Sequence, residues 1–220
     1  MATSNAAPDD ILNSAQLSDS LRALAQRGVL RRVAKNMLLI QEGDVGDTLY
    51  IIVEGRLRAF TSTPEDDRQF FYGTYGPGDY VGEMGLDGGR RSASVMALEP
   101  TLCAVVTRPT LEHYIAENPA FAFELLGRVI ARARSATEQA QMMALKNVYG
   151  RLRWLLSSQA IAQPDGQRLV SPRPTHLEIA SRIGCGREMV SRVMKDLERG
   201  DFIRTVPQGL LILRELPADW

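Results

Sequence analysis

Cysteine and histidine are both scarce in this 220-residue sequence, which contains two of each. Cys103 and Cys185 are far apart in the sequence, so they indicate neither a disulfide framework nor a metal-ligand cluster. His113 and His176 lie outside the β-rich region described below, which excludes the histidine-ligated metal enzymes built on β-rolls. No nucleophile, base and orienting group stand out together either. We therefore expect no catalytic site and no metal site.

Long apolar runs are also missing. The longest, Leu49 to Val53 and Leu210 to Leu213, are a few residues each, whereas a helix that crosses a bilayer needs about 20. Residues 1–10 contain no Lys or Arg and so lack the basic start of a secretory signal. We therefore expect a cytoplasmic protein without a membrane span.

Composition and charge indicate a globular protein with two unlike halves. Hydrophobic residues make up 45% and charged residues 24%, and the length suits two domains. The net charge is zero, but residues 1–146 hold 15 Lys and Arg against 18 Asp and Glu, whereas residues 147–220 hold 11 against 8. The C-terminal part, with a net charge of +3, is the better candidate for binding a polyanion.

The region from Val33 to about Thr107 has the pattern of a β-sandwich or β-roll. Short β-forming runs alternate with glycine turns, among them Gly76-Pro77-Gly78-Asp79. Residues Leu49 to Val53 are apolar on both faces of a strand, which predicts a strand inside the roll. The preceding segment, Leu17 to Leu30, is predicted to form a short helix.

A long helix is predicted between Pro119 and Asn147, because this run contains no further proline and a single glycine. Apolar and small residues recur there at alternate spacings of four and three, as in a two-stranded coiled coil. These residues are Ala122, Leu126, Val129, Ala133, Ala136, Ala140 and Met143. The helix could instead be buried on its own domain. We favour dimerisation, because central alanines allow a second helix to approach closely.

The C-terminal part has the pattern of a winged helix-turn-helix. Thr175 with Glu178 forms a capping box that predicts a helix to Ile183, and Gly184-Cys185-Gly186 predicts a turn. A second helix follows from Arg187 to about Arg199. Residues Phe202 to Leu213 then suggest two short strands, the wing.

The second helix of this pair separates apolar from polar positions. Val190, Val193, Met194 and Leu197 form a stripe to be buried. The positions left outside are Arg187, Glu188, Ser191, Arg192 and Lys195. The second helix of a helix-turn-helix inserts its first residues into the major groove, where Arg pairs with guanine and Glu accepts from cytosine. An ordinary helical hairpin with a solvated charged face remains the alternative, although the clustered basic residues favour DNA.

A second candidate site lies in the β-rich region. Gly82-Glu83-Met84 is followed by Arg91-Ser92, and an arginine beside a hydroxyl and backbone amides can hold a phosphate. The Glu83 carboxylate can accept a hydrogen bond from a ribose hydroxyl. From the residues alone, a glycine-rich turn with a surface ion pair between Glu83 and Arg91 is an equally good interpretation.

Nearly the whole chain resembles the cyclic AMP receptor protein and FNR family of bacterial transcription regulators. The resemblance lies in the segment from Gly82 to Ser92, in the helix-turn-helix and in the order of these elements along the chain. The resemblance implies an α+β fold: a cyclic-nucleotide-binding β-roll with an N-terminal helix in residues 1–117, a dimerisation helix and hinge in 118–147, and a winged helix-turn-helix in 148–220. It assigns Glu83 to the ribose, Arg91 and Ser92 to the cyclic phosphate, and backbone support to Gly82 and Met84. It also places Arg132, Ala136 and Thr137 of the long helix toward the ligand.

The resemblance implies a homodimer that binds double-stranded DNA, with Arg187, Glu188 and Arg192 reading a TGTGA-type palindrome and RNA polymerase as a partner. Cyclic AMP is the expected allosteric ligand. Three departures from the family pattern concern its two sites. Gly186 and Met189 replace hydroxyl residues that contact phosphate, the loop between Leu86 and Arg91 is short, and Ala136 lacks a hydroxyl. Cyclic di-GMP, cyclic GMP or activity without ligand are the alternatives, whereas two cysteines are too few for the family's iron–sulfur cluster.

Overall fold

The computed structural model describes residues 11–13, 15–62, 69–164 and 166–218. Residues 1–10, for which we predicted no export signal, lie outside this part of the chain. The chain divides into two compact units. Among the described residues, the first comprises 11–62 and 71–129, and the second comprises 69–70 and 130–218. Among the described helices, none combines the length and apolar character needed to span a bilayer.

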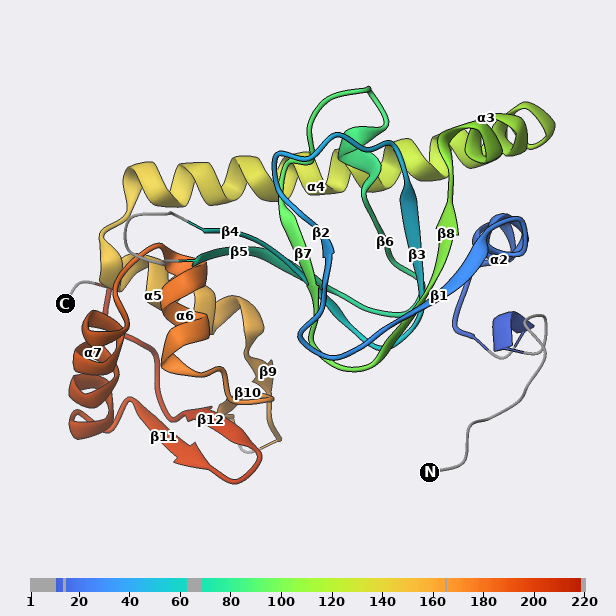
Figure 1. Ribbon diagram of the computed structural model, residues 1–220. Helices are drawn as coiled ribbons and strands as arrows, with labels where there is room; N and C mark the ends of the chain where they lie inside the picture. Colours follow the sequence, from blue (N-terminus) through green and yellow to red (C-terminus); the bar gives the residue numbers. More distant parts are fainter. Residues whose placement is uncertain (1–10, 14, 63–68, 165, 219–220) are drawn as a thin grey trace. The chain divides into compact units, whose positions relative to one another are not determined.

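The first unit is a β-roll made of two four-stranded sheets (Figure 1). One sheet has the order β1 (Val29–Val33), β8 (Thr101–Val106), β3 (Leu49–Glu54) and β6 (Tyr80–Val81). The other has the order β2 (Leu38–Ile40), β7 (Ser94–Ala97), β4 (Leu57–Ser62) and β5 (Gln69–Tyr75). A short 3-10 helix, η1 (Glu83–Gly85), follows β6. The predicted β-roll is confirmed.

Strand β3 lies inside the roll, as the sequence predicts. All residues from Leu49 to Val53 are buried. Leu49, Ile51 and Val53 belong to one hydrophobic cluster, while Tyr50 and Ile52 belong to another, so one strand supplies two packed layers. Cys103 in β8 is fully buried in the second cluster, and burial raises the pKa of its thiol to about 12. This thiol is therefore un-ionised at neutral pH.

The helix predicted for Leu17 to Leu30 is wrong in its second half. The helix α2 covers Asp19–Ala25, and Val29 already pairs with Val105 of β8. At Gly28 a Cβ atom would lie 2.7 Å from the Val105 carbonyl oxygen, so the chain approaches β8 too closely there for a larger residue. Sheet pairing thus overrides the helical pattern, because Val29 suits a strand.

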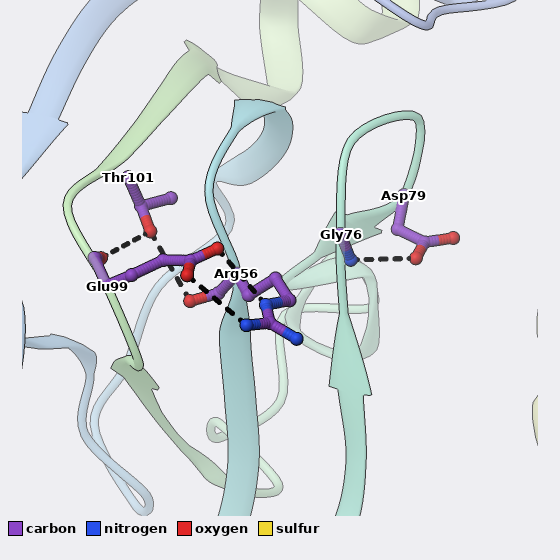
Figure 2. A network of polar contacts seen from close by, with 5 residues as sticks. All are labelled: Arg56, Gly76, Asp79, Glu99 and Thr101. Carbon is purple, nitrogen blue, oxygen red and sulfur yellow. Dashed lines mark hydrogen bonds and ion pairs between the residues drawn. The ribbon is translucent and has the colours of Figure 1, made fainter. Parts of the chain in front are cut away.

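The turns at one end of the roll are held by polar contacts (Figure 2). Arg56, between β3 and β4, donates from Nε and Nη2 to the two carboxylate oxygens of Glu99, at 3.1 and 3.3 Å. The buried Thr101 hydroxyl donates to the carbonyl oxygen of Glu99 at 2.8 Å. Asp79 closes the turn before β6, because its Oδ2 accepts from the Gly76 amide at 3.0 Å.

Two helices follow the roll, α3 (Arg108–Glu117) and α4 (Ala120–Leu145), which confirms the predicted long helix. The start of α4 is fastened to the roll. Arg128 forms an ion pair with Asp79, with 3.1 Å between Nη1 and Oδ1, and the Tyr80 hydroxyl donates to the Leu125 carbonyl at 3.3 Å. The Arg128 guanidinium also lies over the Tyr80 ring, 5.4 Å from its centroid, so several contacts join α4 to the turn and strand at positions 79 and 80.

Helix α4 leaves apolar side chains uncovered. Phe123, Leu126 and Ile130 are 77%, 51% and 41% exposed. Of the seam predicted from the sequence, Leu126 and the alanines at 133, 136 and 140 are exposed, whereas Ala122, Val129 and Met143 are partly buried. The exposed positions 123, 126, 130 and 133 are also three or four residues apart. Positions 126 and 133 belong to the predicted seam, whereas 123 and 130 each lie one residue after a predicted position. These residues are available to a second helix.

The second unit contains α5 (Val148–Gln159), α6 (His176–Ile183) and α7 (Arg187–Arg199) beside a four-stranded sheet (Figure 1). The sheet has the order β11 (Ile203–Val206), β12 (Gly209–Ile212), β10 (Arg168–Val170) and β9 (Ile161–Ala162). The predicted wing is therefore confirmed as β11 and β12. Strands β9 and β10 were not predicted, because they are only two and three residues long.

The capping box at Thr175 is present. The Thr175 hydroxyl accepts from the Glu178 amide at 3.1 Å, and the Glu178 carboxylate accepts from the Thr175 amide at 2.8 Å. We expect Thr175→Ala to lower the free energy of unfolding by about 1 kcal/mol, because α6 loses its side-chain cap. Urea denaturation followed by circular dichroism measures this loss. Thr175→Ser keeps the hydroxyl and is the control; an equal loss in both variants would contradict the capping role.

Candidate functional site

Arg91 is the central residue of the candidate site in the β-roll. Its side chain is buried, and the guanidinium donates from Nη1 to the Gly82 carbonyl at 2.7 Å and from Nη2 to the Thr48 carbonyl at 3.0 Å. Glu83 is buried as well, so the interpretation of these two residues as a surface ion pair is wrong. Two neutral carbonyl dipoles face a full positive charge here, and a phosphate would offer the guanidinium a stronger acceptor.

Glycines make the space around this guanidinium. Gly82 has φ of +96°, and a Cβ there would lie 2.5 Å from the Thr48 carbonyl oxygen. A Cβ at Gly85 would lie 2.3 Å from the Gly46 carbonyl oxygen, and one at Gly46 would lie 3.0 Å from Nη2 of Arg91. Of these residues, Gly82 was predicted from the sequence, whereas Gly46, Thr48 and Gly85 were not. Only the folded roll brings residues near position 46 to Arg91, and no local spacing reveals this.

The other predicted ligand residues differ in exposure and place. Met84 is 52% exposed and Ser92 is exposed, both in the first unit with Arg91. Arg132, Ala136 and Thr137 lie on the part of α4 that belongs to the second unit. Ala136 and Thr137 are exposed, and the Thr137 hydroxyl donates to the Ala133 carbonyl one turn back, at 3.0 Å.

The predicted DNA-contacting residues come together on α7. A shallow depression in the surface is lined by Gly186, Arg187, Glu188, Ser191, Arg192 and Lys195. On the opposite side, Val190, Val193, Met194 and Leu197 are buried in the core of the unit, as the sequence predicts. Three cations and one carboxylate therefore share a single open face of one helix. This arrangement suits the hydrogen-bonding edges of base pairs.

The turn before α7 requires glycine at one position. Gly184 ends α6 with φ of +63°, in the left-handed region that other residues rarely adopt. Gly186 is the N-cap of α7, and no side chain of the described residues caps that end. Cys185 lies between them, and burial raises the pKa of its thiol. Among the described residues, no group of three or more His, Cys, Asp or Glu could hold a metal ion.

His176 of α6 contacts a residue of this face and was not predicted from the sequence. Its Nδ1 lies 2.8 Å from Oγ of Ser191, which joins the start of α6 to α7. Burial lowers the pKa of the ring, and the charges of Arg173 and Arg187 lower it further, while Glu198 acts in the opposite direction. The two residues are fifteen positions apart on different helices, so no sequence spacing indicates the pair.

Comparison with known proteins gives matches to both units. Residues 30–118 match the cyclic nucleotide-binding domain family, and residues 150–218 match the Crp-like helix-turn-helix domain family. The chain is 28% identical over 200 residues to the cAMP-activated global transcriptional regulator CRP of Salmonella typhimurium, covering 88% of this chain and 93% of that protein. It is 29% identical over 175 residues to a CRP-like cAMP-activated regulator of Mycobacterium tuberculosis, covering 78% of each.

A solved structure with a similar fold is that of CLP, described as a c-di-GMP responsive global regulator of Xanthomonas campestris. Its TM-score is 0.75 at 22% identity, with 90% of this chain and 99% of the other covered. At this identity the likeness concerns the fold.

Proposed function

Because the chain belongs to the CRP/FNR family of transcription regulators, we propose that it is a homodimer whose DNA binding is controlled by a cyclic nucleotide, with cyclic AMP as the first candidate. The proposed sites are Gly82, Glu83, Met84, Arg91 and Ser92 of the roll with Arg132, Ala136 and Thr137 of α4 for the ligand, and the α7 face for DNA. We keep the domain boundaries 1–117, 118–147 and 148–220, and infer a cytoplasmic protein that acts with RNA polymerase.

The observation that carries the DNA-binding proposal is the common face of α7. Five side chains chosen from the sequence as base-reading candidates line one depression, and two of its cations, Arg187 and Arg192, can each make paired hydrogen bonds to guanine. Glu188 between them accepts from cytosine. A TGTGA-type half-site, which the family resemblance suggests, offers both kinds of base.

The dimer proposal rests on the uncovered side of α4. Phe123, Leu126 and Ile130 would leave water if the α4 helices of two subunits packed together. A ligand that favours one arrangement of these helices would change the spacing of the two α7 helices. Half-sites one helical turn apart then bind tightly in only one of the arrangements.

The ligand proposal rests on the buried arginine. Arg91 with its neighbour Ser92 supplies donors for a cyclic phosphate, and Glu83 supplies an acceptor for ribose. Cyclic di-GMP is the second candidate, because this chain shares its fold with a regulator described as responsive to that ligand.

Fluorescence anisotropy tests both parts. A labelled duplex with a TGTGA-type palindrome is titrated with the protein at fixed salt, without ligand and with cyclic AMP, cyclic GMP or cyclic di-GMP, because salt alone changes affinity. We expect tightening with cyclic AMP and no change with cyclic GMP. A duplex of the same composition with scrambled half-sites is the control.

The alternative results separate the two parts of the proposal. Equal binding to the scrambled duplex would contradict sequence-specific recognition. Release of DNA by cyclic di-GMP, or tight binding that no nucleotide changes, would contradict cyclic AMP as the activating ligand and leave the DNA-binding role in place.

A further inference from the structure

The hydrogen bond between His176 and Ser191 places a titratable ring at the edge of the DNA-reading face. Ser191 lines the depression on α7, and its Oγ lies 2.8 Å from Nδ1 of His176, the first residue of α6. The ring is partly exposed. Among the described residues, its other nitrogen, Nε2, has no hydrogen-bond partner. Any anion that approaches this edge of α7 therefore meets an unused ring nitrogen.

The charges around the ring come from the segment before α6 and from α7. Arg173 precedes α6, and Arg187 and Glu198 lie on α7. Burial and the two arginines lower the pKa of the ring, which favours the neutral form of His176 at pH 7 in the free protein. A DNA phosphate carries the opposite charge to these arginines, so a phosphate beside the ring offsets their effect and favours the protonated form of His176.

We propose that His176 is a positioning residue of the DNA interface that orients Ser191 and takes up a proton when a backbone phosphate binds beside it. This inference rests on the proposed DNA-binding function. A neutral imidazole has one N–H, whereas the protonated ring donates through both nitrogens. The protonated ring of the complex donates to Ser191 from Nδ1 and to a phosphate oxygen from Nε2, and the second bond is charge-assisted.

Proton uptake makes DNA affinity depend on pH. Because DNA raises the pKa of the His176 ring, protonation of the ring increases the affinity for DNA. This gain is fully present below the pKa that the ring has in the free protein, and it is lost as the pH rises through the pKa that the ring has in the complex. Each unit by which DNA raises this pKa gives about a tenfold gain in affinity per subunit.

Anisotropy titrations of the palindromic duplex at pH 6 and pH 8, at constant salt and saturating cyclic AMP, test the proposal. We expect the wild-type protein to bind more tightly at pH 6 than at pH 8, by up to about a hundredfold for a dimer in which each ring shifts by one unit. His176→Gln, which can still hydrogen-bond to Ser191 but does not titrate, should bind equally at the two values. His113→Gln removes the only other histidine and should behave as the wild-type protein.

Proton NMR gives a direct second measurement. The His113→Gln variant leaves His176 as the single histidine, and its ring signal should titrate at higher pH with duplex than without. Equal pH dependence in the wild-type and His176→Gln proteins, no pH dependence in the wild type, or an unchanged ring pKa on DNA binding would each overturn the proposal. Absence of specific DNA binding at both pH values would instead refute the proposed function itself.

Discussion

Arg91→Leu is expected to abolish the response to cyclic nucleotide. Leucine fills part of the arginine's volume but donates no hydrogen bond, so the cyclic phosphate loses its charged partner in a buried site. Isothermal titration calorimetry should detect no nucleotide binding, and anisotropy should show the same DNA affinity with and without cyclic AMP. Nucleotide-stimulated DNA binding by this variant would contradict the assignment.

The matched control is the neighbouring arginine. Arg90 is exposed and donates to the Gly43 carbonyl at 2.7 Å, so Arg90→Leu removes the same charge one position away from the site. It should bind nucleotide as the wild-type protein does. Because Arg91→Leu leaves the carbonyls of Gly82 and Thr48 without their donor, it costs about 1–3 kcal/mol of stability for each. If this variant fails to fold, Arg91→Lys keeps the charge and should weaken nucleotide binding by about 1.5–3 kcal/mol through a lost charge-assisted bond.

Arg192→Ala is expected to weaken binding to the TGTGA-type site by about 1–3 kcal/mol and to relax the choice of base at one position. The exposed guanidinium is close enough to the other residues of the α7 depression to read a base edge together with Glu188. A set of duplexes with each base substituted in turn, measured by anisotropy at one salt concentration, would locate that position. The free energy of unfolding should stay within about 0.5 kcal/mol of wild type, because Arg192 is exposed.

Arg199→Ala separates base reading from simple charge loss. Arg199 lies at the exposed end of the same helix, 3.8 Å from Asp196, and outside the depression. Arg199→Ala changes the net charge by the same amount as Arg192→Ala. It should weaken binding only slightly, and to the same extent for every duplex. If Arg192→Ala also weakened every sequence to the same extent, Arg192 would be a phosphate contact instead of a base contact.

Elements defined by local chemistry could be predicted from the sequence. The capping box at Thr175, the buried stripe of α7 and the doubly apolar strand β3 all appear where the residues place them, because each follows from the period of a helix or strand. The end of α2 could not be predicted, since Val29 is fixed by pairing with Val105, far away in the chain.

The candidate sites divide in the same way. The side chains on the open face of α7 share one helix, so their spacing alone predicts their common direction. The surroundings of Arg91 and the partner of Ser191 depend on tertiary contacts: Thr48 is 43 positions from Arg91, and His176 is on another helix from Ser191. Sequence patterns report contacts within an element, and these contacts join different elements.

The two sides of α7 also bear on how such a protein can acquire new target genes. Val190, Val193, Met194 and Leu197 face the core, while Arg187, Glu188, Arg192 and Lys195 are exposed. If the proposed function holds, mutations at the exposed set should change operator preference with little effect on folding, so the sequence specificity can change in evolution without loss of stability. Position 191 differs, because its hydroxyl is bonded to His176. A mutation there changes two residues' interactions at once, so this position should vary only together with position 176.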